Sequence, residues 1–411
     1  MSLLSKYDEA TPLQRQKMVR KWLDEKPRAL FQEMRDSRPI MRTALGVLVA
    51  RFDDVIEVLR LHDTYTVALY QPKMGDFMLA QDDVAAHFRD KSIMRAMLNR
   101  DDLPAIRALI AGKVKAALDT ASGNIELINQ VTRMAPIALV EEYFGFRGAP
   151  KGKLFEWSYW NQRDAFHNQP FDYNNDADDI HAKAQNALNE MKGYLISLAQ
   201  KRAQEIGAGT APQDVLTRIM KTKFADDVGF TPARFIINVG GLLIGSVETT
   251  SQAAAQAIDE LLRRPKILNE ARAAALRDDL TVFDGYVWEA LRFQPISPYF
   301  FRTASTAHTL GRGKGYETAI EAGENILPLV QSAMFDETRF PDSSTFNPTR
   351  SLNDMFHLGW GHHECLGKYP AMVMIPEIVR QVILKNDITI KSALDRKGTP
   401  FPEQFEISYT V

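Results

Sequence analysis

The chain has 411 residues, of which 45% are hydrophobic, 25% charged and 9% aromatic, an ordinary composition for a soluble globular protein. Fifty Lys and Arg against fifty-two Asp and Glu give a formal charge of −2, which excludes a generally basic nucleic-acid binder. The single cysteine excludes an internal disulfide framework and Cys-rich zinc modules, and it fits a reducing cytosol.

Neither a targeting segment nor a membrane segment is expected. Residues 1–26 are charged throughout and contain no apolar stretch typical of a secretion signal. The most apolar stretch, residues 235–247, is shorter than the roughly 20 residues that a membrane span needs, and it contains Asn238. We therefore expect a cytoplasmic protein without a membrane anchor.

Helical patterns predominate along the chain, with strands near both ends. Strands are predicted over 39–51 and, mixed with turns, over 297–350; helices are predicted over 13–34, 53–61, from 82, from 104, and over 231–264, 265–277, 282–293 and 366–385. Thr231 and Pro232 favour a helix start, Pro265 favours its end, and Pro376 predicts a kink. Residues 168–178 read as a polar loop, and 311–315, although glycine-rich, as a turn between strands rather than a phosphate loop.

We find no repeat or linker, so the sequence predicts one compact, mainly α domain over 1–411. Its parts are a β-containing N-terminal lobe over about 36–75, a helical core over about 82–296, a strand region with the cysteine loop over 297–367, and a C-terminal helix and β-hairpin over 366–411.

The lone cysteine lies in the glycine-rich stretch 358–367, LGWGHHECLG. A helix is predicted to follow Cys365, so the helix N-terminus favours its thiolate, a ligand suited to haem iron. For an isolated cysteine, a buried free thiol in a glycine-rich turn is the commoner explanation. A zinc site made of His362, His363, Glu364 and Cys365 is disfavoured, because adjacent residues do not easily converge on one tetrahedral ion.

This loop resembles the cysteine-ligand loop of the cytochrome P450 family, F-G-x-G-x-H/R-x-C-x-G, with Leu358 in place of the usual Phe. The matching positions are Gly359, Gly361, His363, Cys365 and Gly367. The resemblance implies the mainly α, single-domain cytochrome P450 fold with small β-sheets. It also implies haem b as cofactor, with the Cys365 thiolate as axial iron ligand and Leu358, Gly359 and Gly361 beside it.

A second stretch, Glu289-Ala290-Leu291-Arg292, places two opposite charges three residues apart on a helix. Such a pair is usually solvated; the resemblance makes Glu289 and Arg292 the family's structural ion pair. The third, basic partner of that pair falls on Thr345, so either Arg350 substitutes or the triad is incomplete.

A third stretch, residues 245–250 (GSVETT), lies in the long helix predicted over 231–264. Thr249 can simply bond back to the carbonyl one turn earlier. The stretch also resembles the family's A/G-G-x-D/E-T-T segment, with Ser246 replacing the second glycine. The resemblance makes Glu248 and Thr249 the catalytic acid–alcohol pair that delivers protons during oxygen activation.

A fourth stretch, residues 83–91, resembles the family pattern D-P-P-x-H-x-R-x-R. His87 and Lys91 are four residues apart on one helix face, and Lys91 keeps the charge of the usual Arg but loses its fork geometry. Alone, such a helix is usually just solvated. The resemblance implies that His87, Lys91, Arg302 and His363 bind the two haem propionates.

By analogy with the family, the pocket for a hydrophobic substrate has six wall residues. These are Phe77, Gly241, Ile244, Gly245, Pro298 and Phe300.

The resemblance implies a monomeric monooxygenase that inserts one oxygen atom from O2 into a hydrophobic small molecule. The length leaves no room for a flavin or iron–sulfur domain, so we expect electrons from a separate ferredoxin or flavodoxin with its NAD(P)H reductase. Two alternatives stay open: a peroxygenase of the same fold that uses H2O2, and a non-catalytic haem-thiolate sensor or binding protein. The presence of both Glu248 and Thr249 argues against the peroxygenase.

Overall fold

The computed structural model describes residues 2–410. Its longer helices are α1 (Leu3–Glu9), α2 (Pro12–Glu25), α3 (Pro27–Ser37), α4 (Phe52–Arg60), α6 (Val84–Met97), α7 (Leu103–Ala121), α8 (Met134–Leu139), α9 (Lys153–His167), α10 (Ala177–Gly207), α11 (Val215–Lys221), α12 (Pro232–Leu262), α13 (Pro265–Ala275), α14 (Thr281–Phe293) and α16 (Lys368–Ile383); α5 (Gln71–Met74) and α15 (Val330–Ala333) are single turns. The strands are β1 (Ile40–Thr43), β2 (Gly46–Val49), β3 (Tyr65–Thr66), β4 (Asn124–Glu126), β5 (Arg302–Ala304), β6 (His308–Leu310), β7 (Thr318–Ile320), β8 (Asn325–Pro328), β9 (Asn386–Asp395) and β10 (Gln404–Thr410).

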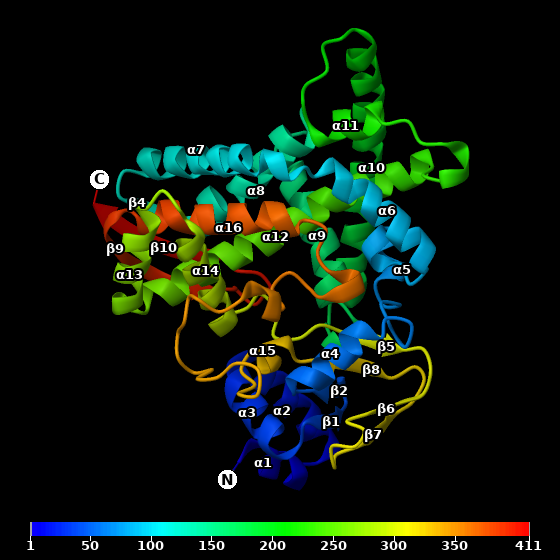
Figure 1. The fold of residues 1–411 in the computed structure, drawn as a ribbon, viewed down its shortest axis with the longest axis vertical. Coiled ribbons are helices and arrows are strands. Elements are labelled where there is room, and N and C mark those ends of the chain that lie inside the picture. The colour runs from blue at the N-terminus through cyan, green and yellow to red at the C-terminus, as the bar shows by residue number, and fades with distance from the viewer. Residues whose placement is uncertain (1, 411) are drawn as a thin grey trace.

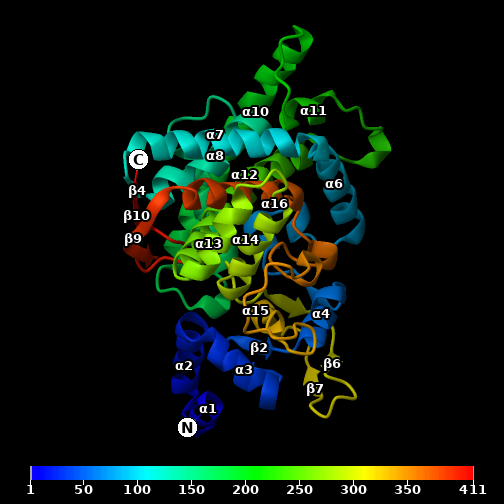
Figure 2. The same cartoon turned by 60° about the vertical axis from the view of Figure 1, so that its left-hand side comes forward.

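The helices form the main body, and most of the strands lie in a smaller lobe beside α1 to α4 (Figure 1). In that lobe five strands form a sheet in the order β1-β2-β8-β5-β3, in which only β2 and β8 are parallel. A separate sheet has β10 in its centre, paired with β9 on one side and with β4 on the other, beside the end of α7 (Figure 2). The expected mainly α class with small sheets near both chain ends is confirmed.

Local signals in the sequence explain where several elements begin and end. The start predicted at Thr231 is confirmed, because its side chain accepts a hydrogen bond from the Arg234 amide at 3.3 Å. The helical pattern predicted over 13–34 is confirmed, but it is divided between two helices, because Pro27 starts α3 after α2 ends at Glu25. The glycine-rich stretch 311–315 connects β6 to β7, as predicted. Pro376 lies inside α16.

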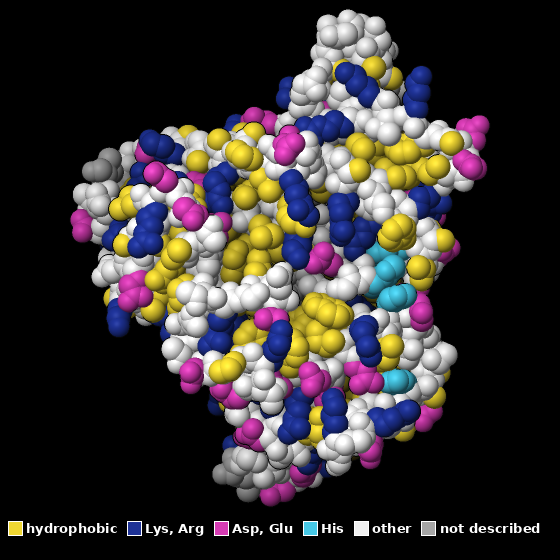
Figure 3. Space-filling view, viewed as in Figure 1, with side chains coloured by type: hydrophobic (Ala, Val, Ile, Leu, Met, Phe, Trp, Pro, Cys, Tyr) yellow, Lys and Arg dark blue, Asp and Glu magenta, His cyan; other side chains and the backbone are white. Residues whose placement is uncertain are grey.

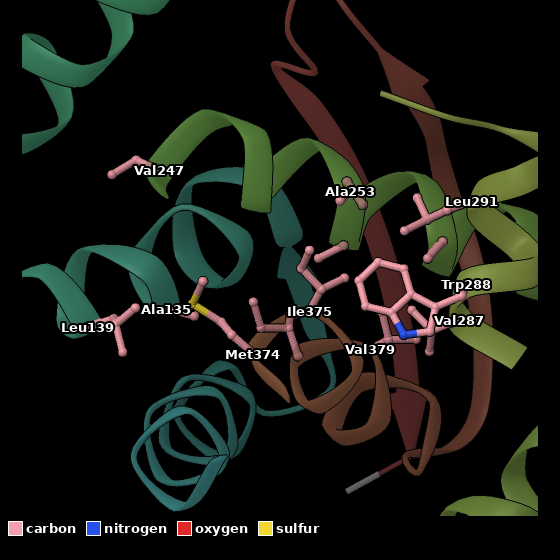
Figure 4. Close-up of a cluster of buried hydrophobic side chains, with 14 of the residues drawn as sticks. Ala135, Leu139, Val247, Ala253, Val287, Trp288, Leu291, Met374, Ile375 and Val379 are labelled. Atoms are coloured by element: carbon pink, nitrogen blue, oxygen red, sulfur yellow. The ribbon is translucent and has the colours of Figure 1, made fainter. Parts of the chain in front are cut away.

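Helix α12 runs through the middle of the molecule and is buried over most of its length. Its Val247 and Ala253 pack in one apolar cluster with side chains of α8, α14 and α16 (Figure 4). Within residues 2–410, no helix is both long enough and apolar enough to cross a bilayer.

The ion pair between Glu289 and Arg292 lies in α14 and is fully buried. Arg292 donates to both carboxylate oxygens, at 2.9 and 2.7 Å, and to the carbonyls of Met334 and Ser343. Arg350 lies beside the pair, with its Nε 3.5 Å from Glu289 Oε1. The cluster therefore joins α14 to the segment that leads toward the cysteine loop.

We expect Arg292→Leu to lower the free energy of unfolding by about 3–5 kcal/mol, because it leaves the Glu289 carboxylate buried with fewer partners. Urea unfolding followed by circular dichroism measures this. The control is Lys21→Ala, which removes an exposed ion pair with Glu25 and should leave the midpoint nearly unchanged. Equal midpoints for the two variants would contradict the assigned structural role of Arg292.

Candidate functional site

A cavity of about 310 Å³ lies between the middle of α12 and the loop that carries Cys365. Its lining is mostly apolar, which suits a hydrophobic ligand and excludes water from whatever binds there. The polar or titratable lining groups are few: Tyr70, Ser246, Thr249, Thr250, Ser297, Arg302, His357, His363 and Cys365, with Trp288 contributing an indole.

Glycines shape the loop around Cys365. Gly359 and Gly361 have positive φ angles of 73° and 66°, which residues with a side chain rarely adopt. A Cβ on Gly359 would also lie only 3.1 Å from the carbonyl oxygen of His363. The Cys365 amide donates to the Leu358 carbonyl at 2.8 Å, so the loop closes on itself and presents the thiol to the cavity.

Burial raises the pKa of the Cys365 thiol, while a hydrogen bond from the Gly367 amide opposes that shift. The sequence predicts a thiolate favoured by the helix N-terminus. Helix α16 begins only at Lys368, three residues after Cys365.

Two of the four residues expected to bind propionates line the cavity. Arg302 is buried and donates to the Phe301 carbonyl at 2.8 Å. Within residues 2–410, neither ring nitrogen of His363 has a hydrogen-bond partner, and burial together with Arg302 lowers its pKa. A buried cation and an unpaired imidazole at one cavity wall suit an anionic group.

The other two, His87 and Lys91, both contact the carbonyl oxygen of His362. His87 Nδ1 also pairs with the Met78 carbonyl at 2.8 Å, and burial lowers the pKa of this histidine. His362 is stacked between His87 and His62, with ring centroids 3.9 and 4.3 Å apart. Histidine side chains gather on this face of the molecule (Figure 3). Neither His87 nor Lys91 lines the cavity.

Thr249 and Glu248 lie on different sides of α12. Thr249 lines the cavity, and its hydroxyl donates to the Gly245 carbonyl at 2.6 Å, the local bond expected of a threonine in a helix. Glu248 is buried and accepts two hydrogen bonds from Arg133, at 2.9 and 3.1 Å; Arg133 also contacts Glu403 at 2.8 Å. Burial raises the pKa of Glu248 to about 7, and Arg133 opposes this shift.

Five of the six residues expected as pocket walls line the cavity. These are Phe77, Gly241, Ile244, Gly245 and Phe300. Pro298 is not among the lining residues; its carbonyl accepts a hydrogen bond from the Gln331 amide at 3.1 Å. Sequence reasoning missed Tyr70, Met74 and Phe166, which come from segments with no recognisable motif and reach the cavity only through the tertiary fold.

A family model described as cytochrome P450 matches residues 155–400. The chain is 28% identical over 265 residues to the cytochrome P450 monooxygenase PikC of Streptomyces venezuelae, covering 64% of this chain and 57% of that protein. It is 24% identical over 369 residues to a steroid C26-monooxygenase of Mycobacterium tuberculosis, covering 87% of this chain and 85% of that protein.

Solved structures agree on the fold. Cytochrome P450 CYP109Q5 from Chondromyces apiculatus superimposes with a TM-score of 0.78 at 20% identity, covering 95% of this chain and 97% of that chain. CYP109E1 from Bacillus megaterium, solved in complex with testosterone, superimposes with a TM-score of 0.77 at 17% identity, covering 94% of this chain and 98% of that chain. The family model matches more than half of the sequence, and the chain therefore belongs to the cytochrome P450 family of haem-thiolate monooxygenases.

Proposed function

We propose that this protein inserts one oxygen atom from O2 into a hydrophobic small molecule bound in the cavity. One observation carries the proposal: the only thiol of the chain and the hydroxyl of Thr249 line the same apolar cavity, on the cysteine loop and on α12. The first group suits a metal ligand and the second a proton donor.

The residues present fit a haem. Cys365 would be the axial ligand, and Arg302 and His363 would bind the propionates, since both nitrogens of His363 lack partners within residues 2–410. His87 and Lys91 would support that edge through the His362 carbonyl. When bound, the haem iron supplies the oxygen chemistry, and the thiolate donates electron density to it.

The protein's own residues contribute orientation, exclusion of water and control of protons. Phe77, Phe166 and Phe300 would hold the substrate against α12 and keep bulk water out. Thr249 Oγ1 would hold a proton at the cavity surface, and Glu248, held by Arg133, would supply the next one from the protein interior. Electrons would come from a separate ferredoxin or flavodoxin with its NAD(P)H reductase.

We expect the reduced, carbon-monoxide-treated holoprotein to show a thiolate-type Soret band, and both Cys365→Ala and Cys365→Ser to lose it, because neither replacement offers sulfur to the iron. A spectrum unaltered by these variants contradicts the assignment of Cys365. Turnover with peroxide alone, but not with O2 and a ferredoxin system, would instead favour the peroxygenase. A spectral response to ligands, with no product formed either from peroxide or from O2 and a ferredoxin system, would favour a sensor or binding protein.

We expect coupled product formation to fall as pH rises through about 7, because the carboxyl of Glu248 loses its proton there. Glu248→Gln should abolish this dependence and lower the product yield at pH 6 at least about tenfold. The measurement is product formed per NAD(P)H consumed across pH 5.5 to 8.5.

The matched control is Glu403→Gln, which removes the second carboxylate at Arg133. In Glu403→Gln the product formed per NAD(P)H should still fall as pH rises, but the midpoint of that fall should lie at lower pH, since the charge of Glu403 raises the pKa of Glu248. An inflection that survives in Glu248→Gln would assign it to another group.

We expect Gly241→Ala to weaken the binding of bulky apolar ligands about tenfold, because a Cβ there would lie 2.0 Å from Cε2 of Phe77 and push that ring into the cavity. Spectral titration with a series of azoles of increasing size measures the affinity. Gly112→Ala, on α7 with no atom within 4 Å of the new Cβ, is the control and should bind as wild type. Unchanged affinities for the largest azoles in Gly241→Ala would contradict the assigned wall.

A further inference from the structure

Four consecutive backbone carbonyls in the middle of α12, those of residues 242–245, each accept a hydrogen bond from a side chain. Two of the donors belong to α12 itself: the hydroxyls of Ser246 and Thr249 bond back to Leu242 and Gly245. Such bonds compete with the helix's own ladder and bend it. This is the turn that immediately precedes Glu248.

The other two donors come from a different helix, α9. Ser158 Oγ lies 3.3 Å from the carbonyl oxygens of both Leu243 and Ile244, and Gln162 Nε2 donates to Ile244. Ser158 and Gln162 are buried, at 0% and 1% exposure, and four residues apart, so they lie on one face of α9. Burying these two polar groups is unfavourable unless they are paired, and the α12 carbonyls are the partners.

The bonds from α9 act on the turn that carries the proposed proton donors. In a regular helix the Ile244 carbonyl accepts the amide of Glu248, four residues later. A side-chain amide that shares this carbonyl weakens the backbone bond and draws the carbonyl toward α9. The conformation around Glu248 and Thr249 therefore depends on where α9 lies.

Helix α9 also contacts the cavity and a segment over it. Phe166, at the end of α9, lines the cavity. Asp164 binds Lys73 of α5 at 2.8 Å, and Lys73 also donates to the Asn168 carbonyl at 2.6 Å. Because α5 contributes Met74 to the cavity wall, α5 and α9 both border the space that a substrate would fill.

We propose that Gln162 and Ser158 are positioning residues that couple the position of α9, and so the filling of the cavity, to the turn of α12 bearing Glu248 and Thr249. They touch neither substrate nor cofactor and act through the carbonyls of Leu243 and Ile244. The inference rests on the proposed monooxygenase function and adds residues that none of the four sequence motifs contains.

The test uses Gln162→Leu and Ser158→Ala in the holoenzyme, with amide hydrogen exchange read over residues 246–250. Without the Gln162 donor the Ile244 carbonyl bonds more strongly to the Glu248 amide, so exchange of that amide should slow at least about threefold in Gln162→Leu. Product formed per NAD(P)H should fall about fivefold while substrate affinity stays within about twofold of wild type. Ser158→Thr keeps the hydroxyl, so its amide exchange and its product formed per NAD(P)H should be closer to wild type than those of Ser158→Ala.

The control is Asn161→Leu, which removes a neighbouring buried amide whose bond, to the Trp157 carbonyl at 2.8 Å, stays within α9. It should leave amide exchange over 246–250 unchanged.

Amide exchange that becomes faster in Gln162→Leu would mark a merely structural contact and overturn the inference. So would a Gln162→Leu variant in which both the exchange and the product formed per NAD(P)H are unchanged. If Gln162→Leu does not fold, the Ser158→Ala and Ser158→Thr pair decides. A wild type without coupled product defeats the proposed function, whereas the exchange readout still judges the positioning role.

Discussion

Burial of α12 along most of its length is the constraint on which the site depends. A polar group inside the protein needs a partner, and several buried polar side chains of this helix find theirs on neighbouring segments. The Asn238 amide group accepts from the Met78 amide at 3.1 Å and donates to Asp90 at 2.8 Å. Gln252 reaches the Ile296 carbonyl at 2.9 Å, at the cavity wall. One buried helix thereby sets the positions of segments that are far apart in the sequence.

The cysteine side of the cavity is positioned differently, through backbone conformation and one buried ion cluster. Glycines with positive φ at 359 and 361 turn the chain so that Cys365 faces the cavity. The segment before that loop is held to α14 by Arg292, whose guanidinium binds both Glu289 and carbonyls of the segment. The thiol therefore lies on a loop whose conformation is fixed by these contacts. Helices α5 and α9, which form another part of the cavity wall, are connected to each other by a few polar contacts, such as that between Lys73 and Asp164.

The sequence predicts what is local and misses what is long-range. The start of α12 follows from Thr231 and Pro232, because a cap and a proline act within one turn. By contrast, nothing near Glu248 in the sequence indicates Arg133, its partner 115 residues away. Nor does the sequence indicate that His87 pairs with backbone carbonyls on both ring nitrogens, since backbone acceptors leave no trace in residue type. The analogy with the family also predicts Pro298 as a wall residue, and it is not among the residues that line the cavity.

Adjacent residues on an α-helix point about 100° apart, so Glu248 and Thr249 do not face the cavity together in a regular helix. The cavity receives Thr249, and Glu248 is held by Arg133 on the buried side. In the proposed function, a proton that passes from one to the other would have to cross the helix surface near the turn that precedes them. That turn is the one whose carbonyls are already shared with side-chain donors, two of them from α9. In this proposal the acid and the alcohol are insufficient by themselves, because α9, which also contributes to the cavity wall, would govern how easily their turn of α12 opens.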